Sequence, residues 1–211
     1  MGIEAIRWIY DVSGDFLTCS LKVGAFKVWN TSQKAPKNTI KVWTQGIRTF
    51  EGIVGSSEFY VVVFKNSSLG LFNMKKKKVV WTIEAGHSET IFDIKFHPTD
   101  GSLLATGSYD GYIKIWDITT MKLIKSFSSK GVTTGTLGEK RWLVVYAISW
   151  DPRDGTRLVS SHNNGEVMMW DLVKGKVLSN IKSEDCKPIY KIDWNKKNED
   201  MIAFGSTEGI W

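Results

Sequence analysis

The sequence has few cysteines and no long apolar run, and each lack excludes a class of protein. Only two of its 211 residues are cysteine, Cys19 and Cys186, and they lie far apart in the chain. A disulfide-held secreted domain would need more of them, so we expect reduced thiols and a cytoplasmic location. No apolar stretch approaches the roughly 18 residues of a membrane span. The start, "MGIEAIRWIYD", lacks the basic and apolar regions of a secretory signal.

Sequence motifs for catalysis, metal binding and cofactor binding are lacking as well. The histidines His87, His97 and His162 have no ligand spacing with one another or with cysteine, as a metal site would require. No Ser-His-Asp order, nucleophile elbow, carboxylate pair or cofactor fingerprint stands out. The stretch 131–142 ("GVTTGTLGEKRW") is rich in glycine but lacks the Gly-Lys-Ser/Thr order of a phosphate-binding loop. We therefore predict no enzymatic activity, no cofactor, no metal and no small-molecule substrate.

Composition and periodicity indicate a globular all-β protein. Hydrophobic residues make up 42% and charged residues 24% of the chain, as in folded domains rather than disordered ones. In the stretch 107–117 ("GSYDGYIKIWD"), Asp110-Gly111 precedes residues that alternate between apolar and other types. Asp-Gly favours a tight hairpin because glycine adopts positive φ easily, and a period of two indicates a strand. Patterning with the period of a helix is absent.

This hairpin pattern recurs along the chain. Aromatic residues end the copies at positions 29, 72, 116 and 170, so the steps are 43, 44 and 54 residues. Each copy contains four short strand-like segments separated by turns, which is the unit of a β-propeller blade. The long third step contains an insertion (128–141). We interpret it as a connection between blades, on the face that carries the loops before the first strands, where it could bind a partner.

The best copy resembles the WD-repeat family. It opens with Gly86-His87, has a proline turn at His97-Pro98 and closes with Trp116-Asp117, and the resemblance covers nearly the whole chain. It implies propeller blades and a hydrogen-bonded tetrad that ties the strands of one blade together. Carried over residue by residue, the tetrad comprises His87, Thr106 (with Ser108 as the alternative), Asp110 and Trp116.

The other copies depart from this pattern. The position of Thr106 is taken in turn by Cys19, Val62, Ser160 and Phe204, and no second copy has a histidine before its first strand. We therefore expect one blade to carry the polar network and the others to rely on apolar packing. We also expect region 87–127 to be the most stable part of the chain.

The repeats predict about four and a half blades, at approximately 3–45, 46–84, 85–127, 142–182 and 186–211. In the last one, the spacing from Gly209 places the signature aromatic beyond Trp211, the final residue. A closed WD-repeat ring typically has about seven blades. We therefore expect an incomplete, open ring, either a fragment or a chain that another chain or segment completes.

Two functions compete for this fold. The resemblance implies a non-catalytic scaffold that binds other proteins and assembles complexes. Its contacts would come from the loops before the first strands and from the turns between second and third strands, with Tyr109 the best anchor by residue type. The residues expected to bind a partner are Ser88, Glu89, Thr90, Tyr109, Asn163 and Thr207.

The alternative is a module that binds nucleic acid or another polyanion. The net charge is +6, and four of the positive charges form one run: Lys75, Lys76, Lys77 and Lys78. Such a run could bind phosphates, although a solvated hairpin turn explains it more simply. Basic residues are not spread over one set of loops, which favours the protein-binding scaffold.

Overall fold

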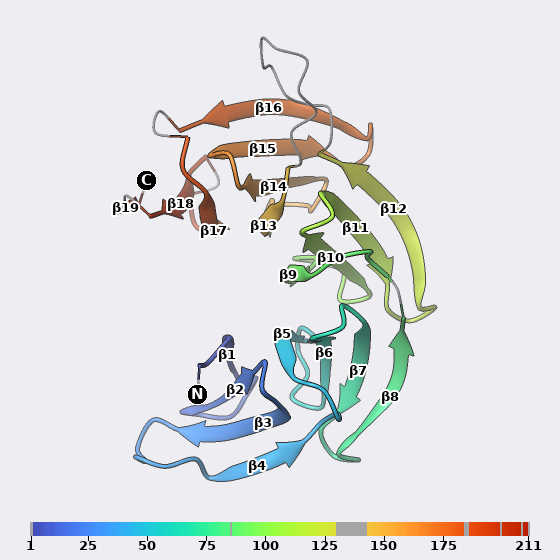
Figure 1. Cartoon of the computed structure of the whole chain (residues 1–211), viewed down its shortest axis with the longest axis vertical. Coiled ribbons are helices and arrows are strands. Elements are labelled where there is room, and N and C mark those ends of the chain that lie inside the picture. Colours follow the sequence, from blue (N-terminus) through green and yellow to red (C-terminus); the bar gives the residue numbers. More distant parts are fainter. Residues whose placement is uncertain are drawn as a thin grey trace. The chain divides into compact units, whose positions relative to one another are not determined.

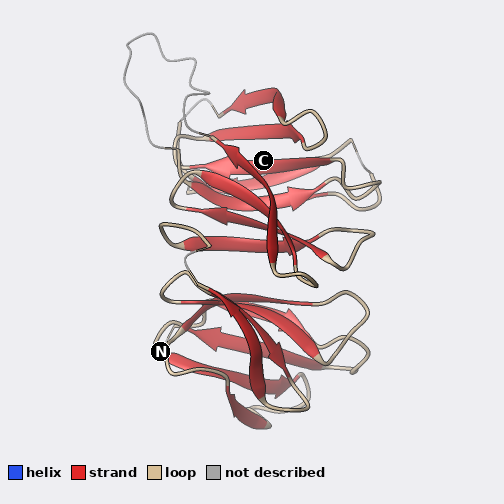
Figure 2. Cartoon of the chain, turned by 90° about the vertical axis from the view of Figure 1, so that its right-hand side faces the viewer, coloured by secondary structure: helices blue, strands red, loops and turns tan. Residues whose placement is uncertain are grey.

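The structure is a computed structural model that describes residues 2–84, 86–129, 143–183, 186–198, 200–207 and 209–210. Within these ranges all regular structure is β-strand, in 19 strands (Figures 1 and 2). The described residues contain no helix long and apolar enough to cross a membrane. The insertion expected to bind a partner lies almost entirely outside the described residues, as does Trp211.

The strands form five antiparallel sheets, here called blades 1 to 5. Blade 1 contains β1 (Ala5–Trp8), β2 (Asp15–Ser20), β3 (Val23–Asn30) and β4 (Asn38–Lys41). Blade 2 contains β5 (Ile47–Gly52), β6 (Phe59–Phe64), β7 (Leu69–Asn73) and β8 (Lys78–Ile83). Blade 3 contains β9 (Ile91–Phe96), β10 (Leu103–Ser108), β11 (Tyr112–Asp117) and β12 (Lys122–Ser128). Blade 4 contains β13 (Val145–Trp150), β14 (Arg157–His162), β15 (Glu166–Asp171) and β16 (Lys176–Lys182). Blade 5 contains β17 (Ile189–Trp194), β18 (Ile202–Ser206) and β19 (Gly209–Ile210).

Each sheet joins strands that follow one another in the sequence. This meander results from short turns, of which the turn at Gly111 is an example: the residue has a φ of 78°, which glycine adopts without strain. Among the described strands, no sheet combines strands from both ends of the chain. The predicted fold class is confirmed: an all-β protein built of four-stranded propeller blades, with four complete blades and a partial fifth.

The chain comprises two compact units, Met1–Thr90 and Ile91–Trp211. In the first unit, blades 1 and 2 share a core rich in aromatic rings, in which Phe26, Phe50 and Phe72 are fully buried. In the second unit, blade 3 packs on blade 4, and blade 4 packs on blade 5. The first strand of each blade is here called its inner strand. In blades 3, 4 and 5 the inner strands β9, β13 and β17 are neighbours in that order (Figure 1).

Backbone and side-chain hydrogen bonds tie these inner strands together. Ile148 N donates to Asp93 Oδ2 over 3.1 Å and the indole of Trp150 donates to the Lys95 carbonyl over 3.0 Å, both between blades 3 and 4. Trp194 N donates to Ser149 Oγ over 3.0 Å, between blades 4 and 5. All three donor residues are buried, so these bonds satisfy polar groups that water cannot reach and fix the spacing of the three inner strands.

Tryptophan–hydroxyl hydrogen bonds occur in three of the described blades rather than one. The indole of Trp116 donates to Thr106 Oγ1 over 2.9 Å in blade 3, as the tetrad requires. In blade 1, however, Trp29 donates to Thr18 Oγ1 over 2.9 Å. The assignment of Cys19 to this position is wrong, because an irregularity of register between Thr18 and Ser20 shifts the hairpin by one residue.

Blade 4 contains a network that the sequence interpretation missed. Trp170 donates to Ser160 Oγ over 2.8 Å, and Ser160 Oγ lies 2.9 Å from His162 Nε2. His162 Nδ1 lies 3.1 Å from the carbonyl oxygen of Val144, which can only accept. Nδ1 therefore carries the proton and Nε2 accepts from Ser160. The expectation that all blades but one rely on apolar packing is wrong, because a histidine on β14 takes part where none precedes the first strand.

Candidate functional site

The inner strands of three neighbouring blades each carry an aromatic residue at a β-bulge. The register of β9 with β10 skips Phe92, that of β13 with β14 skips Tyr146, and that of β17 with β18 skips Tyr190. In each strand the skipped residue is the second one. A bulge leaves its extra residue outside the ladder and redirects its side chain, and bulges are frequent beside binding sites.

The three bulge residues and Tyr109 form a continuous row of rings, here called the aromatic row. The ring centroids of Tyr109 and Phe92 are 6.3 Å apart, those of Phe92 and Tyr146 are 5.1 Å apart, and those of Tyr146 and Tyr190 are 5.0 Å apart. Tyr109 and Tyr190 are each 45% exposed, and the other two rings are half-buried. The row thus crosses blades 3, 4 and 5 within one unit and stays accessible.

The hydroxyl of Tyr146 is neutral at physiological pH. Burial raises the pKa of this phenol, and the neighbouring Tyr190 and Tyr109 raise it further. A neutral phenol can donate a hydrogen bond as well as accept one. The aromatic row therefore combines apolar faces with hydrogen-bonding groups, which is the composition of many protein-binding surfaces.

The structure places the predicted partner-binding residues in different surroundings. Tyr109 is in the aromatic row. Asn163 is half-buried and its Oδ1 accepts from Val144 N over 3.1 Å, so it holds the entry to β13. Thr207 is exposed in the turn between β18 and β19. The remaining three, Ser88, Glu89 and Thr90, belong to the first unit, where the first two are exposed.

The tetrad residues are buried, as their predicted role requires. Asp110 is 2% exposed, and its carboxylate accepts from Tyr112 N over 3.0 Å in the β10–β11 turn. Ser108, the alternative to Thr106, accepts from Asp110 N over 3.2 Å. His87 is 3% exposed. The participation of His87 and Asp110 in a four-residue network stays a prediction.

The basic run lies at the β7–β8 turn, and all four lysines are exposed. Lys75 Nζ is 2.9 Å from Glu58 Oε2, and its hydrogen bond is the largest cause of the lowered pKa of that carboxyl. The pairing neutralises part of the charge. Binding of a polyanion here stays a prediction.

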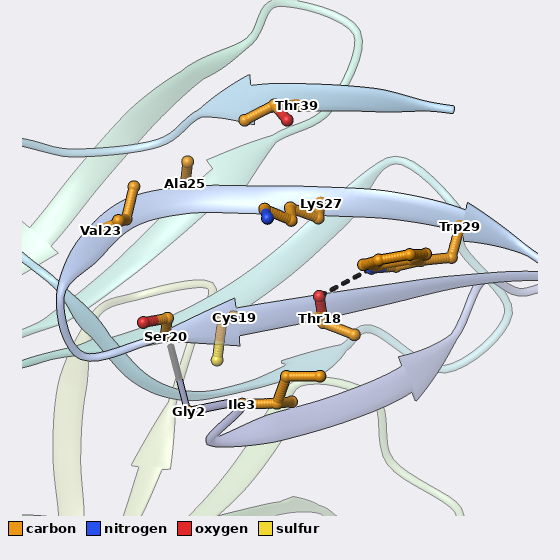
Figure 3. Close-up of a pocket in the computed structure, with 10 residues that line it drawn as sticks. All are labelled: Gly2, Ile3, Thr18, Cys19, Ser20, Val23, Ala25, Lys27, Trp29 and Thr39. Atoms are coloured by element: carbon orange, nitrogen blue, oxygen red, sulfur yellow. Dashed lines mark hydrogen bonds between the residues drawn. The ribbon is translucent and has the colours of Figure 1, made fainter. Parts of the chain in front are cut away.

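A surface pocket of about 220 Å³ lies on blade 1. Figure 3 shows Trp29 and Thr18 on one wall, joined by their hydrogen bond, with Lys27 and Cys19 also lining the pocket. Burial raises the pKa of the Cys19 thiol to about 12, so it is protonated at neutral pH. The lining residues include no carboxylate and no histidine. Within the described parts of the chain, no group of three or more metal-ligating side chains could hold an ion.

Comparisons with known proteins agree with the repeat pattern. The family model "WD domain, G-beta repeat" matches residues 77–117. The model "Anaphase-promoting complex subunit 4 WD40 domain" matches residues 132–197. Together the two matches cover parts of blades 2 to 5.

Three relatives illustrate the similarity. The GATOR2 complex protein WDR24 of Danio rerio is 23% identical over 122 residues, covering 58% of this chain and 14% of that protein. Restriction of telomere capping protein 1 of Kluyveromyces lactis is 24% identical over 207 residues, covering 92% of this chain and 15% of that protein. The GATOR2 complex protein WDR59 of Gallus gallus is 27% identical over 152 residues, covering 72% of this chain and 14% of that protein.

The chain therefore spans only a small part of these relatives' length, 14–15%. The sequence also led us to expect a narrower similarity to WD repeat-containing protein 17, and that expectation stays a prediction. Four-stranded blades, the Trp116–Thr106 bond and the family-model matches all point the same way. The chain belongs to the WD40-repeat family.

Proposed function

We propose that the chain is a non-catalytic scaffold that binds protein partners through the aromatic row. The observation that carries this proposal is the bulge on three successive inner strands, each of which redirects an aromatic side chain. Tyrosine is enriched where proteins bind one another, because a rigid ring adds contact area at little entropic cost. The hydrogen bonds between the inner strands hold the row in place before a partner arrives.

The relatives support the same function at a coarser level. Two of the three are named as GATOR2 complex proteins, so they are components of an assembly. Cys19 and Cys186 are not joined in a disulfide, which agrees with action in the reducing cytoplasm. Completion of the ring by another chain or segment is a further prediction of this proposal.

Site-specific photo-crosslinking tests the proposal. A photoreactive phenylalanine analogue would replace Tyr109, Tyr190 or, as a control, Tyr10, which is 58% exposed but lies in the first unit. We expect positions 109 and 190 to capture the same proteins, and position 10 to capture none of them. Equal capture from all three positions would show that the aromatic row is not the binding surface.

The alternative function, binding of a polyanion, predicts different experimental results. It predicts a steep loss of binding with rising salt and a loss on reversing the charges of Lys75 to Lys78. If the aromatic row is the binding surface, neither higher salt nor reversal of these charges should affect crosslinking from it. The reason is that the lysines belong to blade 2, whereas the row belongs to blades 3 to 5.

A further inference from the structure

We propose that the aromatic row binds an extended, proline-containing segment of a partner protein in the polyproline II conformation. This inference rests on the proposed function and specifies the chemistry of the ligand. Proline-rich segments dock on surfaces lined by aromatic rings, where their preformed helix loses little entropy on binding. Three features of the row favour such a ligand over the alternatives: ring geometry, hydrogen-bond donors and charge.

The ring spacing fits the rise of a polyproline II helix. Successive rings are tilted by 54°, 62° and 47°, so they present faces and edges in turn instead of one flat stack. Their centroids are 5.0–6.3 Å apart. Two residues of a polyproline II helix cover about 6 Å. The four rings therefore match the spacing of apolar groups along one extended segment.

The donors fit the backbone of that segment. A polyproline II helix has no internal hydrogen bonds, so its carbonyl groups need donors from solvent or from a partner. The hydroxyls of Tyr146 and Tyr190 lie on adjacent blades with ring centroids 5.0 Å apart. Each can donate to a carbonyl oxygen while its ring packs against a pyrrolidine. Phe92 contributes packing alone.

The row itself offers no charge to a ligand. Its four rings carry no formal charge at neutral pH, and Asp110, next to Tyr109 in the sequence, is buried at 2% exposure. Lys187 and Lys191, on either side of Tyr190 in the sequence, are exposed. A neutral proline segment needs no counter-charge from the rings, and the decalysine and decaglutamate peptides below test whether charge contributes to binding.

Fluorine NMR of the full chain tests this inference. All six tyrosines would be labelled as 3-fluorotyrosine and assigned by single Tyr→Phe variants. The probe is an acetylated, amidated decaproline peptide, and the comparison peptides are a Gly-Ser decamer, decalysine and decaglutamate. We expect decaproline to shift the resonances of Tyr109, Tyr146 and Tyr190, and to leave those of Tyr10, Tyr60 and Tyr112 in place. The Gly-Ser peptide should shift none.

Matched variants locate the contact. We expect Tyr190→Ala to weaken decaproline binding at least tenfold and Tyr146→Phe, which removes only a hydroxyl, at least threefold. Tyr10→Ala should leave the affinity unchanged. Thermal midpoints within a degree of the parent would show that each variant is folded.

Three results would overturn the inference. Decaproline could shift none of the three resonances of the row, or it could shift all six tyrosine resonances alike. Decalysine or decaglutamate could also bind more tightly than decaproline. If crosslinking from positions 109 and 190 still captures proteins in that case, the scaffold function stands with a different ligand chemistry. If crosslinking fails too, the scaffold proposal fails with it.

Discussion

Trp8 and Trp150 occupy the same place on the inner strands of their blades, yet 67% of Trp8 and 7% of Trp150 is exposed. The register pairs Trp8 with Phe16 and Trp150 with Leu158, each at the start of a second strand. Trp150 is buried among residues of blades 3 and 4, and its indole donates to the Lys95 carbonyl over 3.0 Å. One residue type in one position thus has two different environments.

This pair predicts unequal effects on stability. Trp150→Ala removes a buried ring and an inter-blade hydrogen bond, so we expect the free energy of unfolding to fall by about 3–5 kcal/mol. Trp8→Ala should lower it by about 1 kcal/mol, mainly through loss of the edge contact with Phe16 at 5.6 Å. Urea denaturation of both variants measures the difference. Losses of equal size would contradict the assigned environments.

Two adjacent serines of blade 4 provide a second matched pair. Ser160 and Ser161 are both fully buried, but Ser160 Oγ bonds Trp170 and His162, whereas Ser161 Oγ has no hydrogen-bond partner among the described residues. We expect Ser160→Ala to lower the free energy of unfolding by about 1–3 kcal/mol because it leaves an indole N–H and an imidazole nitrogen unpaired. Ser161→Ala should be neutral or stabilising. The reverse order in a denaturation experiment would refute the blade 4 network.

The repeat made the fold predictable. Aromatic residues at near-constant spacing, together with glycine turns, indicated four-stranded blades because a blade needs four short strands and tight turns. Register was harder to predict. Alternation does not reveal where a strand gains an irregularity, so Cys19 was placed where Thr18 lies. A shift of one residue reverses the face that each side chain occupies.

The candidate site was predictable only in part. Tyr109 was identified because it is a large aromatic residue in an expected turn. The bulge residues Phe92, Tyr146 and Tyr190 were missed because each looks like an ordinary strand residue when the strand is assumed regular. A usable signal was present, since each follows a buried β-branched residue that starts the inner strand: Ile91, Val145 or Ile189.

The two cysteines should differ sharply in reactivity. Cys19 is 2% exposed and its thiol has a pKa raised to about 12 by burial, whereas Cys186 is exposed. The thiolate is the reactive form, so a thiol-specific reagent at pH 8 should modify Cys186 in the folded protein and spare Cys19. Counting modified thiols by mass spectrometry before and after denaturation tests this. Cys186→Ser should abolish the rapid reaction, and rapid modification of that variant would show that Cys19 is accessible.

His162 should make the stability of the chain depend on pH. The residue is fully buried, and desolvation lowers its pKa to about 4 from the ordinary value of 6.5. Because the folded pKa lies below the unfolded one, the unfolded chain binds the proton more readily between these values. The stability that neutral His162 contributes is therefore fully present above pH 6.5. It is lost progressively as the pH falls toward 4, and His162 causes no further loss below pH 4.

The comparison with His162→Gln isolates this contribution, because His97 and several carboxylates also have shifted pKa values that both proteins share. Between pH 7 and pH 5, the parent should lose about 2 kcal/mol more of its free energy of unfolding than the variant. The reason is that glutamine cannot bind the proton that drives the loss. Urea denaturation at the two pH values measures both changes. Parallel losses in the two proteins would mean that His162 binds a proton as readily in the folded as in the unfolded chain, which would contradict the lowered pKa.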